Sequence, residues 1–209
     1  FSSFLDAVLS QPQFQSKIIA TFAFGEQELF CTKPMRKLED FKGVKIRITA
    51  NKDSNIAKLF DALGAKPMQI DYGDTLFALE NKLVDCGVSS YIAAKSAGWF
   101  RHLDYRMNFH LGNGVNGYLV NLKTWNALSS RQKINLDNSV NDLTSRMWDF
   151  TQMSYAKSLL PCPRTEVKCQ DVPVLIEISD QELNRFYQVS IEHVLKPWIN
   201  KCEDQYPGC

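Results

Sequence analysis

Two cations, Lys45 and Arg47, stand two residues apart in the stretch "EDFKGVKIRITA". Side chains two apart in a β-strand point to the same face, so a strand here sends both cations one way and Ile46 and Ile48 the other. A guanidinium meets a carboxylate in its own plane with two hydrogen bonds, which a lysine cannot copy. Arg47 is therefore a candidate for binding the carboxylate of a ligand. The alternative is an arginine with only a structural role, at the surface or between lobes. Lys45 is expected to be solvated.

The six cysteines form the second group with chemical potential. None belongs to a Cys-x-x-Cys motif, and the three histidines do not flank them at metal-ligand spacing. Disulfides in an oxidising compartment are thus favoured over a metal or redox site. Two pairs are seven residues apart, and the second closes a turn-rich loop, "EDQYPG". The predicted pairs are Cys162–Cys169, Cys202–Cys209 and, as the remaining long-range pair, Cys31–Cys86.

Neither an enzyme nor a nucleic-acid-binding protein is indicated. The sequence shows no Ser/His/Asp or Cys/His constellation, no paired acid motif and no phosphate-binding loop. Residues 112–117, "GNGVNG", resemble a nucleotide loop, but no Lys-Ser/Thr follows and the next element reads as a strand. A net charge of +1 gives no general attraction to nucleic acid. We expect no catalytic residues, cofactor or metal.

Composition is that of an ordinary globular protein. The chain has 209 residues, of which 44% are hydrophobic and 22% charged, which suits one or two domains. Its apolar runs are too short to span a bilayer. No secretory signal pattern opens the chain, and its first residue is Phe1 rather than Met, so we expect a removed signal peptide and an extracytoplasmic location.

Strands and helices alternate along the sequence, which predicts an α/β fold with a mostly parallel or mixed sheet. One helix should have Asp53 or Ser54 as its cap, and the next should point Leu76, Phe77 and Leu79 inward. Strands are predicted at 17–24, 28–34, 44–49, 66–70, 83–90, 105–111 and 117–123, and helices at 53–63, 73–82, from 91, at 130–160 and at 180–202.

The helix at 130–160 is the longest element, because its apolar periodicity is not interrupted by Pro or Gly. At about 1.5 Å per residue it would reach about 45 Å, enough to lie across two lobes. A disulfide-closed segment and a strand should follow. We expect Asp180 to cap the last helix and Pro197 to kink or end it.

The order of these elements resembles the solute-binding proteins of the tripartite ATP-independent periplasmic (TRAP) transporters. The resemblance covers about residues 20–200. It rests on four segments in sequence order: "KPMRKLEDFKGVKIRI", "LFDALGAKPMQI", "ALENKLVDCG" and "YLVNLKTWNALSSRQKI". The resemblance implies a periplasmic-binding-protein-like, type II-like lobe with a long lobe-spanning helix. It implies a ligand-gripping α/β lobe at 20–110, a strand and connecting helix at 111–160, and a disulfide-stapled loop, strand and returning helix at 161–209.

The same resemblance assigns candidate ligand-binding residues. Arg47 stands where the family's arginine grips the carboxylate of an organic acid. Tyr72 falls where an aromatic residue often lines the cleft, and Ser89 where a polar residue faces the ligand; a plain turn tyrosine is the alternative for Tyr72. Asn116 is a further candidate, against which stands a simple Asn-Gly hairpin turn.

Three departures from the family pattern bear on function. Where the family often has a second ligand arginine, this chain reads "FGEQELF", and Glu26 or Glu28 would repel a carboxylate. The family's Asp-Gly turn is "DC" here, so a disulfide at Cys86 would alter the loop that carries Ser89. We expect the first half of the usual two-lobe fold to be missing from this chain, either because it is a separate or cleaved-off polypeptide or because it is unresolved, and the apolar face left by it should be covered by a second polypeptide.

Two functions remain open. The chain is either all or half of an extracytoplasmic binding protein that captures a small organic acid for a TRAP-type membrane carrier, or a structural or interaction subunit whose ligand site is lost or altered. In the second case Arg47 should be paired with a protein acid, Glu26 or Glu28 being the nearest in sequence.

Overall fold

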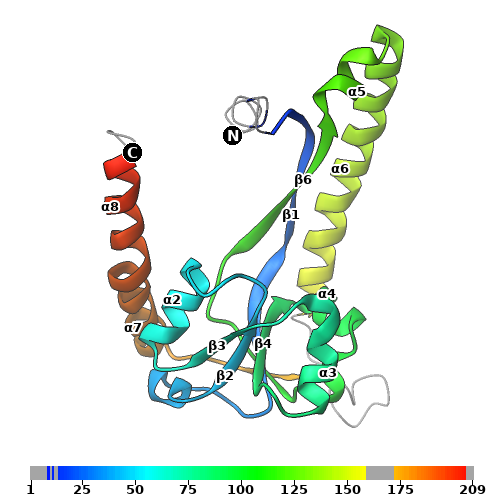
Figure 1. The fold of residues 1–209 in the computed structure, drawn as a ribbon. Coiled ribbons are helices and arrows are strands. Elements are labelled where there is room, and N and C mark those ends of the chain that lie inside the picture. The colour runs from blue at the N-terminus through cyan, green and yellow to red at the C-terminus, as the bar shows by residue number, and fades with distance from the viewer. Residues whose placement is uncertain (1–8, 10, 12–13, 159–171, 206–209) are drawn as a thin grey trace. The chain divides into compact units, whose positions relative to one another are not determined.

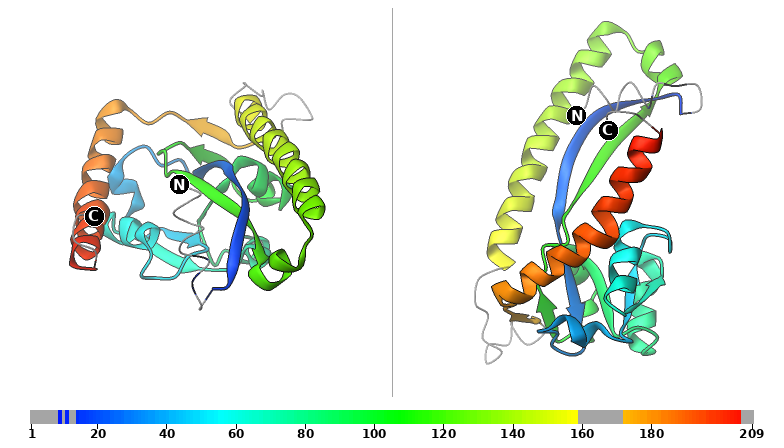
Figure 2. Two further views of the ribbon diagram at one scale, coloured as in Figure 1. Left: turned by 90° about the horizontal axis from the view of Figure 1, so that it is seen from above. Right: turned by 90° about the vertical axis from the view of Figure 1, so that its left-hand side faces the viewer.

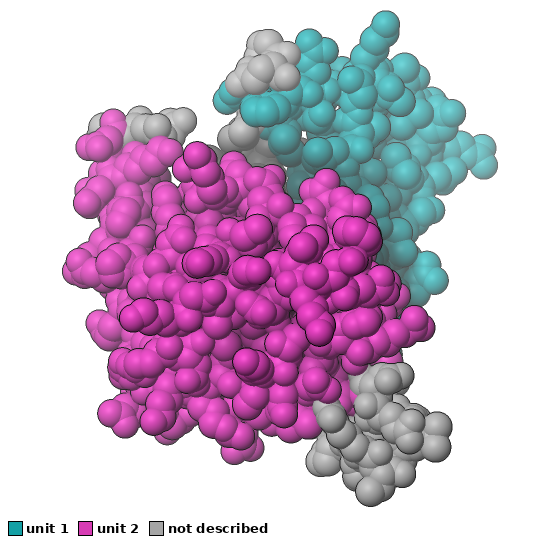
Figure 3. Space-filling model, turned by 60° about the horizontal axis from the view of Figure 1, so that its bottom comes forward, with its two compact units in different colours: residues 1–26, 112–160 teal, residues 27–111, 161–209 magenta. Residues whose placement is uncertain are grey.

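The computed structural model describes residues 9, 11, 14–158 and 172–205, in two compact units (Figure 3). Unit 1 comprises residues 1–26 and 112–160, and unit 2 comprises residues 27–111 and 161–209. Strand β1 (Ser16–Cys31) contributes to both. The other elements of unit 1 are β6 (Asn113–Asn121), α5 (Leu122–Ala127) and α6 (Ser130–Ser158).

Unit 2 is built around a mixed sheet. Its strands are β2 (Lys45–Ile48), β3 (Lys66–Gln69), β4 (Cys86–Ser90), β5 (Tyr105–Met107) and β7 (Val174–Ile176). Their order is β3-β2-β4-β1-β5-β7. The pairs β2/β3, β2/β4 and β5/β7 are parallel, whereas β1 runs antiparallel to β4 and β5. The predicted α/β class with a mixed sheet is confirmed.

Helices cover both faces of this sheet (Figure 1). On one face, Ile46, Ile48 and Leu29 pack with residues of α2 (Asn55–Ala62) and α7 (Asp180–Ser190), and with the 3-10 turn Leu38–Phe41. On the other, Phe30 packs with α3 (Thr75–Glu80), α4 (Tyr91–Ser96) and the 3-10 turn Trp99–Arg101. Arg47 therefore points to one face of the sheet, and its strand neighbours Ile46 and Ile48 point into the core on the opposite face.

The two strands predicted at 17–24 and 28–34 are in fact one strand of 16 residues that ends at Cys31. The strand continues through Gly25 because the pairing with β6 shifts register between Phe24 and Glu26, as in a β-bulge. Beyond that point β4 and β5 take over as partners. The continuity of β1 therefore depends on partner strands that are distant from it in sequence.

The sequence-based predictions for the first two helices of unit 2, α2 and α3, differ in accuracy. Ser54, one of the two predicted caps, accepts a hydrogen bond from Ala57 N and starts α2. In α3 the prediction for Phe77 is wrong, because its side chain is 63% exposed. Thr75, Ala78 and Leu79 face the core instead. These positions follow the i, i+3, i+4 spacing of one helical face, which places residue 77 on the opposite side.

Helix α6 is continuous from Ser130 to Ser158, as predicted, and residues 159 and 160 lie outside the described part (Figure 2). Its apolar residues are mostly exposed. Ile134, Phe150 and Met153 are 59%, 55% and 54% exposed, whereas Val140 is buried. Exposed apolar side chains such as these are often covered by another polypeptide.

The prediction that Asp180 caps the last helix is wrong: Ser179 is the cap, its hydroxyl accepts the backbone N–H of Glu182, and α7 begins at Asp180. Pro197 does not end it: α7 passes through a π-helical turn, Ile191–Leu195, into α8 (Lys196–Gln205) (Figure 2). Proline lacks the N–H that would donate to residue 193 in an α-helix, and the wider π turn just before it relieves that mismatch.

Within the described residues no helix is long and apolar enough to cross a membrane.

Candidate ligand-binding site

Arg47 lies on β2 with its side chain buried on the sheet face that α3 and α4 cover. It is 1% exposed, whereas Lys45 is exposed as predicted. In the sheet, Arg47 pairs with Gly87 of β4, and Gly87 in turn pairs with Phe30 of β1. The predicted alternation along this strand is confirmed. The Arg47 guanidinium is enclosed on this face of the sheet.

The guanidinium of Arg47 contacts backbone oxygens and an aromatic ring. Nε donates to the Ile70 carbonyl at 2.9 Å and Nη1 to the Val88 carbonyl at 3.1 Å. Its Cζ lies 5.2 Å from the centroid of the Trp99 ring, a cation–π arrangement. Nη2 has no hydrogen-bond partner among the described residues, and neither has the buried Trp99 Nε1. Two stacked side chains thus each retain a buried donor without an acceptor.

No carboxylate in the described part of the chain forms an ion pair with Arg47. Burial lowers the pKa of its guanidinium, and the neighbouring Tyr72 and Asp71 oppose that shift. The group keeps its charge, because arginine is in effect always protonated in proteins. A buried cation without a counter-charge is energetically costly.

Tyr72 and Ser89, two of the other predicted residues, also belong to unit 2. The Tyr72 hydroxyl donates to the Ala93 carbonyl at 2.7 Å, and its ring centroid lies 5.9 Å from that of Trp99. Ser89 is buried and directly follows Val88, whose carbonyl accepts from Arg47. It lies within β4, not in a loop. Tyr72 thus lies against the Trp99 ring that also contacts Arg47, and Ser89 is the sequence neighbour of an Arg47 hydrogen-bond partner.

Asn116 belongs to unit 1. It is exposed and lies within β6, paired with Phe22 of β1. The alternative of an Asn-Gly hairpin turn is therefore wrong. The extended pairing with β1 along the whole of β6 overrides the local turn signal.

Glu28 does not pair with Arg47, contrary to the expectation for a lost site. Its Oε2 lies 2.8 Å from Nε of Arg106, and both side chains are at most 2% exposed. The guanidinium of Arg106 also lies 5.1 Å from the ring centroid of Tyr91, and burial raises the pKa of this tyrosine. Arg106 is absent from the candidates drawn from sequence, although an arginine in an apolar strand is itself a signal of a buried acid.

Gly87 is the position where the site is most tightly packed. A Cβ added there would lie 2.9 Å from Cζ3 of Trp99, whose ring is fully buried. We expect Gly87→Ala to lower the free energy of unfolding by about 1–3 kcal/mol, because the ring must shift away from Arg47. Urea unfolding measures this. Gly73→Ala, where a Cβ meets nothing within 4 Å, is the matched control, and equal stability of the two variants would contradict the packing described.

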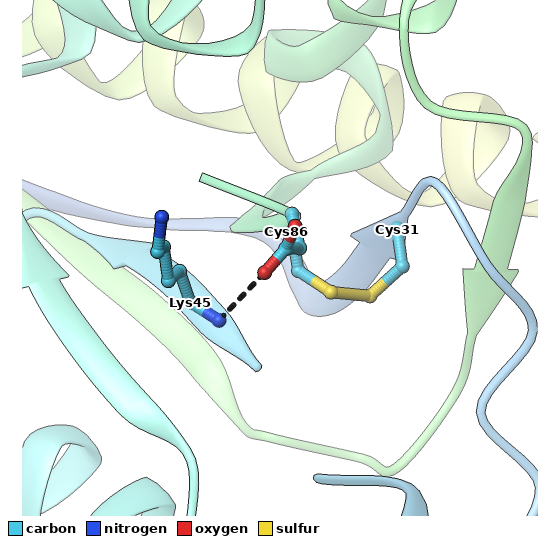
Figure 4. The surroundings of a disulfide bond; sticks show 4 residues. Cys31, Lys45 and Cys86 are labelled. Atoms are coloured by element: carbon cyan, nitrogen blue, oxygen red, sulfur yellow. Dashed lines mark hydrogen bonds between the residues drawn. A yellow bond between two sulfur atoms is a disulfide. The ribbon is translucent and has the colours of Figure 1, made fainter. Parts of the chain in front are cut away.

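The predicted disulfide Cys31–Cys86 is present and joins the end of β1 to the start of β4 (Figure 4). Beside it, the backbone N–H of Lys45 donates to the Asp85 carboxylate at 2.9 Å. Cys202 is also disulfide-bonded, while its predicted partner Cys209 and the pair Cys162–Cys169 lie outside the described residues. No group of three or more His, Cys, Asp or Glu side chains that could hold a metal occurs in the described part.

Comparisons with known proteins agree with this architecture. The family model of the bacterial extracellular solute-binding proteins, family 7, matches residues 2–198. An uncharacterized protein of Haemophilus influenzae is 24% identical over 136 residues, which are 64% of this chain and 40% of the relative. The sialic acid-binding periplasmic protein SiaP of Vibrio cholerae is 27% identical over 123 residues, 58% of this chain and 37% of the relative. The chain thus matches about two fifths of the length of these relatives.

Solved structures share the fold. A TRAP periplasmic solute-binding protein of Roseobacter denitrificans with bound β-D-glucuronate has a TM-score of 0.80 and 21% identity, over 98% of this chain and 64% of that one. DctP6 of Bordetella pertussis, which binds pyroglutamic acid, has a TM-score of 0.81 and 18% identity, over 95% and 62%. A TRAP solute-binding protein of Pseudomonas aeruginosa with bound L-malate has a TM-score of 0.77 and 16% identity, over 96% and 66%.

These matches confirm the resemblance drawn from the sequence, the periplasmic-binding-protein fold and the extracytoplasmic location, with which the Cys31–Cys86 disulfide agrees. The family match extends over nearly the whole chain. The chain belongs to the bacterial extracellular solute-binding proteins, family 7.

Proposed function

We propose that this chain captures a small organic acid through Arg47 and serves a TRAP-type membrane carrier. One observation carries the proposal: Arg47 is a buried cation with no acidic partner among the described residues and with an unsatisfied Nη2. A ligand carboxylate would supply both the missing charge and the missing acceptor. We infer that Tyr72 and Ser89 contact the rest of the ligand.

The ligands of the similar structures support the choice of ligand class. β-D-Glucuronate, pyroglutamic acid and L-malate all carry a carboxyl group. They differ in size and in their other groups, which leaves the carboxylate as their common feature. The Arg47 guanidinium can bind such a carboxylate through its charge and its hydrogen-bond donors. This binding requires no enzymatic step.

The alternative, a structural or interaction subunit without a ligand, is favoured by a separate observation. Glu28 and Arg106 form a buried pair on the same sheet face, so part of this face is already neutralised. The exposed apolar residues of α6 also support the proposal that a second polypeptide covers unit 1. A surface of unit 1 that is covered by a second polypeptide is compatible with either function. The two functions differ in whether Arg47 binds a ligand carboxylate.

Titration calorimetry with a panel of small mono- and dicarboxylates tests the proposal. We expect at least one acid to bind, and its uncharged amide to bind far more weakly because the amide lacks the negative charge. The amide is the matched control for shape. If no acid binds, or if the amide binds as well as its acid, the ligand-binding function is wrong and the structural alternative is favoured.

A further inference from the structure

Trp99, whose ring is stacked on the Arg47 guanidinium, is held in place by the turn that carries it. Gly98 precedes it in the left-handed conformation, with φ 75°, and starts the 3-10 turn. The Trp99 carbonyl accepts from the backbone N–H groups of His102 and Leu103. The side chain is 0% exposed. Trp99 is thus a fully buried residue on a backbone fixed by its own hydrogen bonds.

The orientation of the Trp99 indole follows from its contact with β4. A Cβ added at Gly87 would lie 2.9 Å from Cζ3, 3.4 Å from Cε3 and 3.5 Å from Cη2 of the ring. These three atoms form the edge of the indole that is opposite to Nε1. The Nε1–H donor therefore points away from Gly87, and the close packing at Gly87 keeps it in that orientation.

Two buried donors without acceptors occur on this pair of stacked side chains. The Cζ atom of Arg47 lies 5.2 Å from the centroid of the Trp99 ring, and neither side chain is more than 1% exposed. Arg47 Nη2 and Trp99 Nε1 both lack a hydrogen-bond partner among the described residues. A buried tryptophan N–H usually has a partner, and an unsatisfied buried group needs an explanation. A ligand with two acceptors explains both donors at once.

Tyr72 separates this pair from the protein surface. Its ring centroid lies 5.9 Å from that of Trp99, and the residue is 44% exposed. Its hydroxyl donates to the Ala93 carbonyl at 2.7 Å. The buried Trp99 ring is therefore in contact with a side chain that solvent reaches.

We propose that Trp99 Nε1–H donates a hydrogen bond to an acceptor next to the carboxylate that Arg47 binds, so that the site prefers 2-hydroxy and 2-oxo acids. The inference rests on the proposed function of Arg47. In these acids the second oxygen is on the carbon next to the carboxylate, which matches donors on two stacked side chains. Movement of the half-exposed Tyr72, which breaks its hydrogen bond to Ala93, gives the ligand access.

The fold by itself leaves this choice open. Structures of similar fold hold L-malate, which has a 2-hydroxyl group, and succinate, which has none. A site with a buried donor aimed at a ligand oxygen favours the ligand that carries this oxygen over the analogue that lacks it. Trp99 therefore supplies a preference that Arg47, which contacts only the carboxylate, does not.

Calorimetry with matched acids measures this preference in the wild-type chain. Pyruvate and propionate, L-malate and succinate, and 2-oxoglutarate and glutarate differ within each pair by the oxygen at carbon 2. We expect the acid with that oxygen to bind about tenfold more tightly or better in every pair that gives measurable binding. Equal binding within the pairs overturns the inference and leaves the proposed function standing. No binding by any of the six acids overturns both.

The variant Trp99→Phe keeps an aromatic ring beside Arg47 but removes the N–H donor. We expect the two acids of a pair to bind this variant about equally, and the ratio of their affinities cancels any general loss caused by the smaller ring. Trp198→Phe makes the same change at a half-exposed position of α8, and it should keep the wild-type ratio. An unaltered ratio in a folded Trp99→Phe variant contradicts the role given to Trp99.

Nuclear magnetic resonance of the 15N-labelled wild-type chain tests the contact without a change at Trp99. The chain has four tryptophans, so replacing each of the others, Trp125, Trp148 and Trp198, with phenylalanine assigns the Trp99 indole signal by elimination. We expect the preferred acid of a pair to move the Trp99 indole proton downfield, as a new hydrogen bond does, and its partner acid to leave it in place. A Trp99 signal that neither acid moves, or that both move equally, overturns the inference.

Discussion

Replacing Arg47 with methionine should abolish measurable binding of the acids that the wild-type chain binds. Methionine keeps most of the buried volume beneath Trp99 but removes the charge and every donor. Hydrogen bonds to a charged group are worth about 1.5–3 kcal/mol each, so the loss of a two-bond contact weakens affinity by about a hundredfold or more. Calorimetry with the tightest wild-type ligand gives the result.

Two further variants separate geometry from charge at this position. Arg47→Lys retains the charge but not the planar fork, and we expect about a tenfold loss of affinity or more. Lys45→Met makes the same charge change as Arg47→Met on the same strand at an exposed side chain, and it should bind like the wild type. Equal losses in Lys45→Met and Arg47→Met would point to net charge rather than to a direct contact.

Removal of the Cys31–Cys86 disulfide should cause the largest loss of stability. The bond joins residues 55 positions apart. Closing a loop of this length restricts the unfolded chain, and the usual entropy relation gives about 4 kcal/mol. We expect Cys31→Ala/Cys86→Ala to lower the free energy of unfolding by about that amount in urea titrations.

The control for this variant is a pair of cysteines closer in sequence. Cys202 is disulfide-bonded at the C-terminal end of α8, and its predicted partner is Cys209. A loop of seven residues restricts the unfolded chain less, so Cys202→Ala/Cys209→Ala should cost less than the Cys31–Cys86 variant. If the long-range variant is as stable as the wild type, the disulfide does not hold β1 to β4 as described.

Local patterns in the sequence were sufficient for some features of the site. The period of two residues along β2 predicts the side to which Arg47 points, and the cysteine count leaves Cys31 to pair with Cys86. Both arguments use short-range geometry or simple counting. They need no knowledge of which strands are neighbours, which explains why they succeed.

Features that depend on distant partners could not be predicted in this way. The single strand β1 continues through Gly25 because β6 supports it from far along the chain. The partner of Glu28 is Arg106 because β5 lies beside β1 in the sheet. Asn116 lies in a strand for the same reason, despite its local turn signal. Strand neighbours follow from tertiary topology, which local propensity does not determine.

The central claim is that Arg47 binds the carboxylate of a small organic acid. A crystal structure of the chain with an acid from the calorimetric panel tests it most directly. We expect a ligand carboxylate oxygen about 2.7–2.9 Å from the Arg47 guanidinium, with Nη2 as one of the donors. A ligand carboxylate bound elsewhere, or an Arg47 guanidinium paired with an acid of the protein itself, would contradict the account.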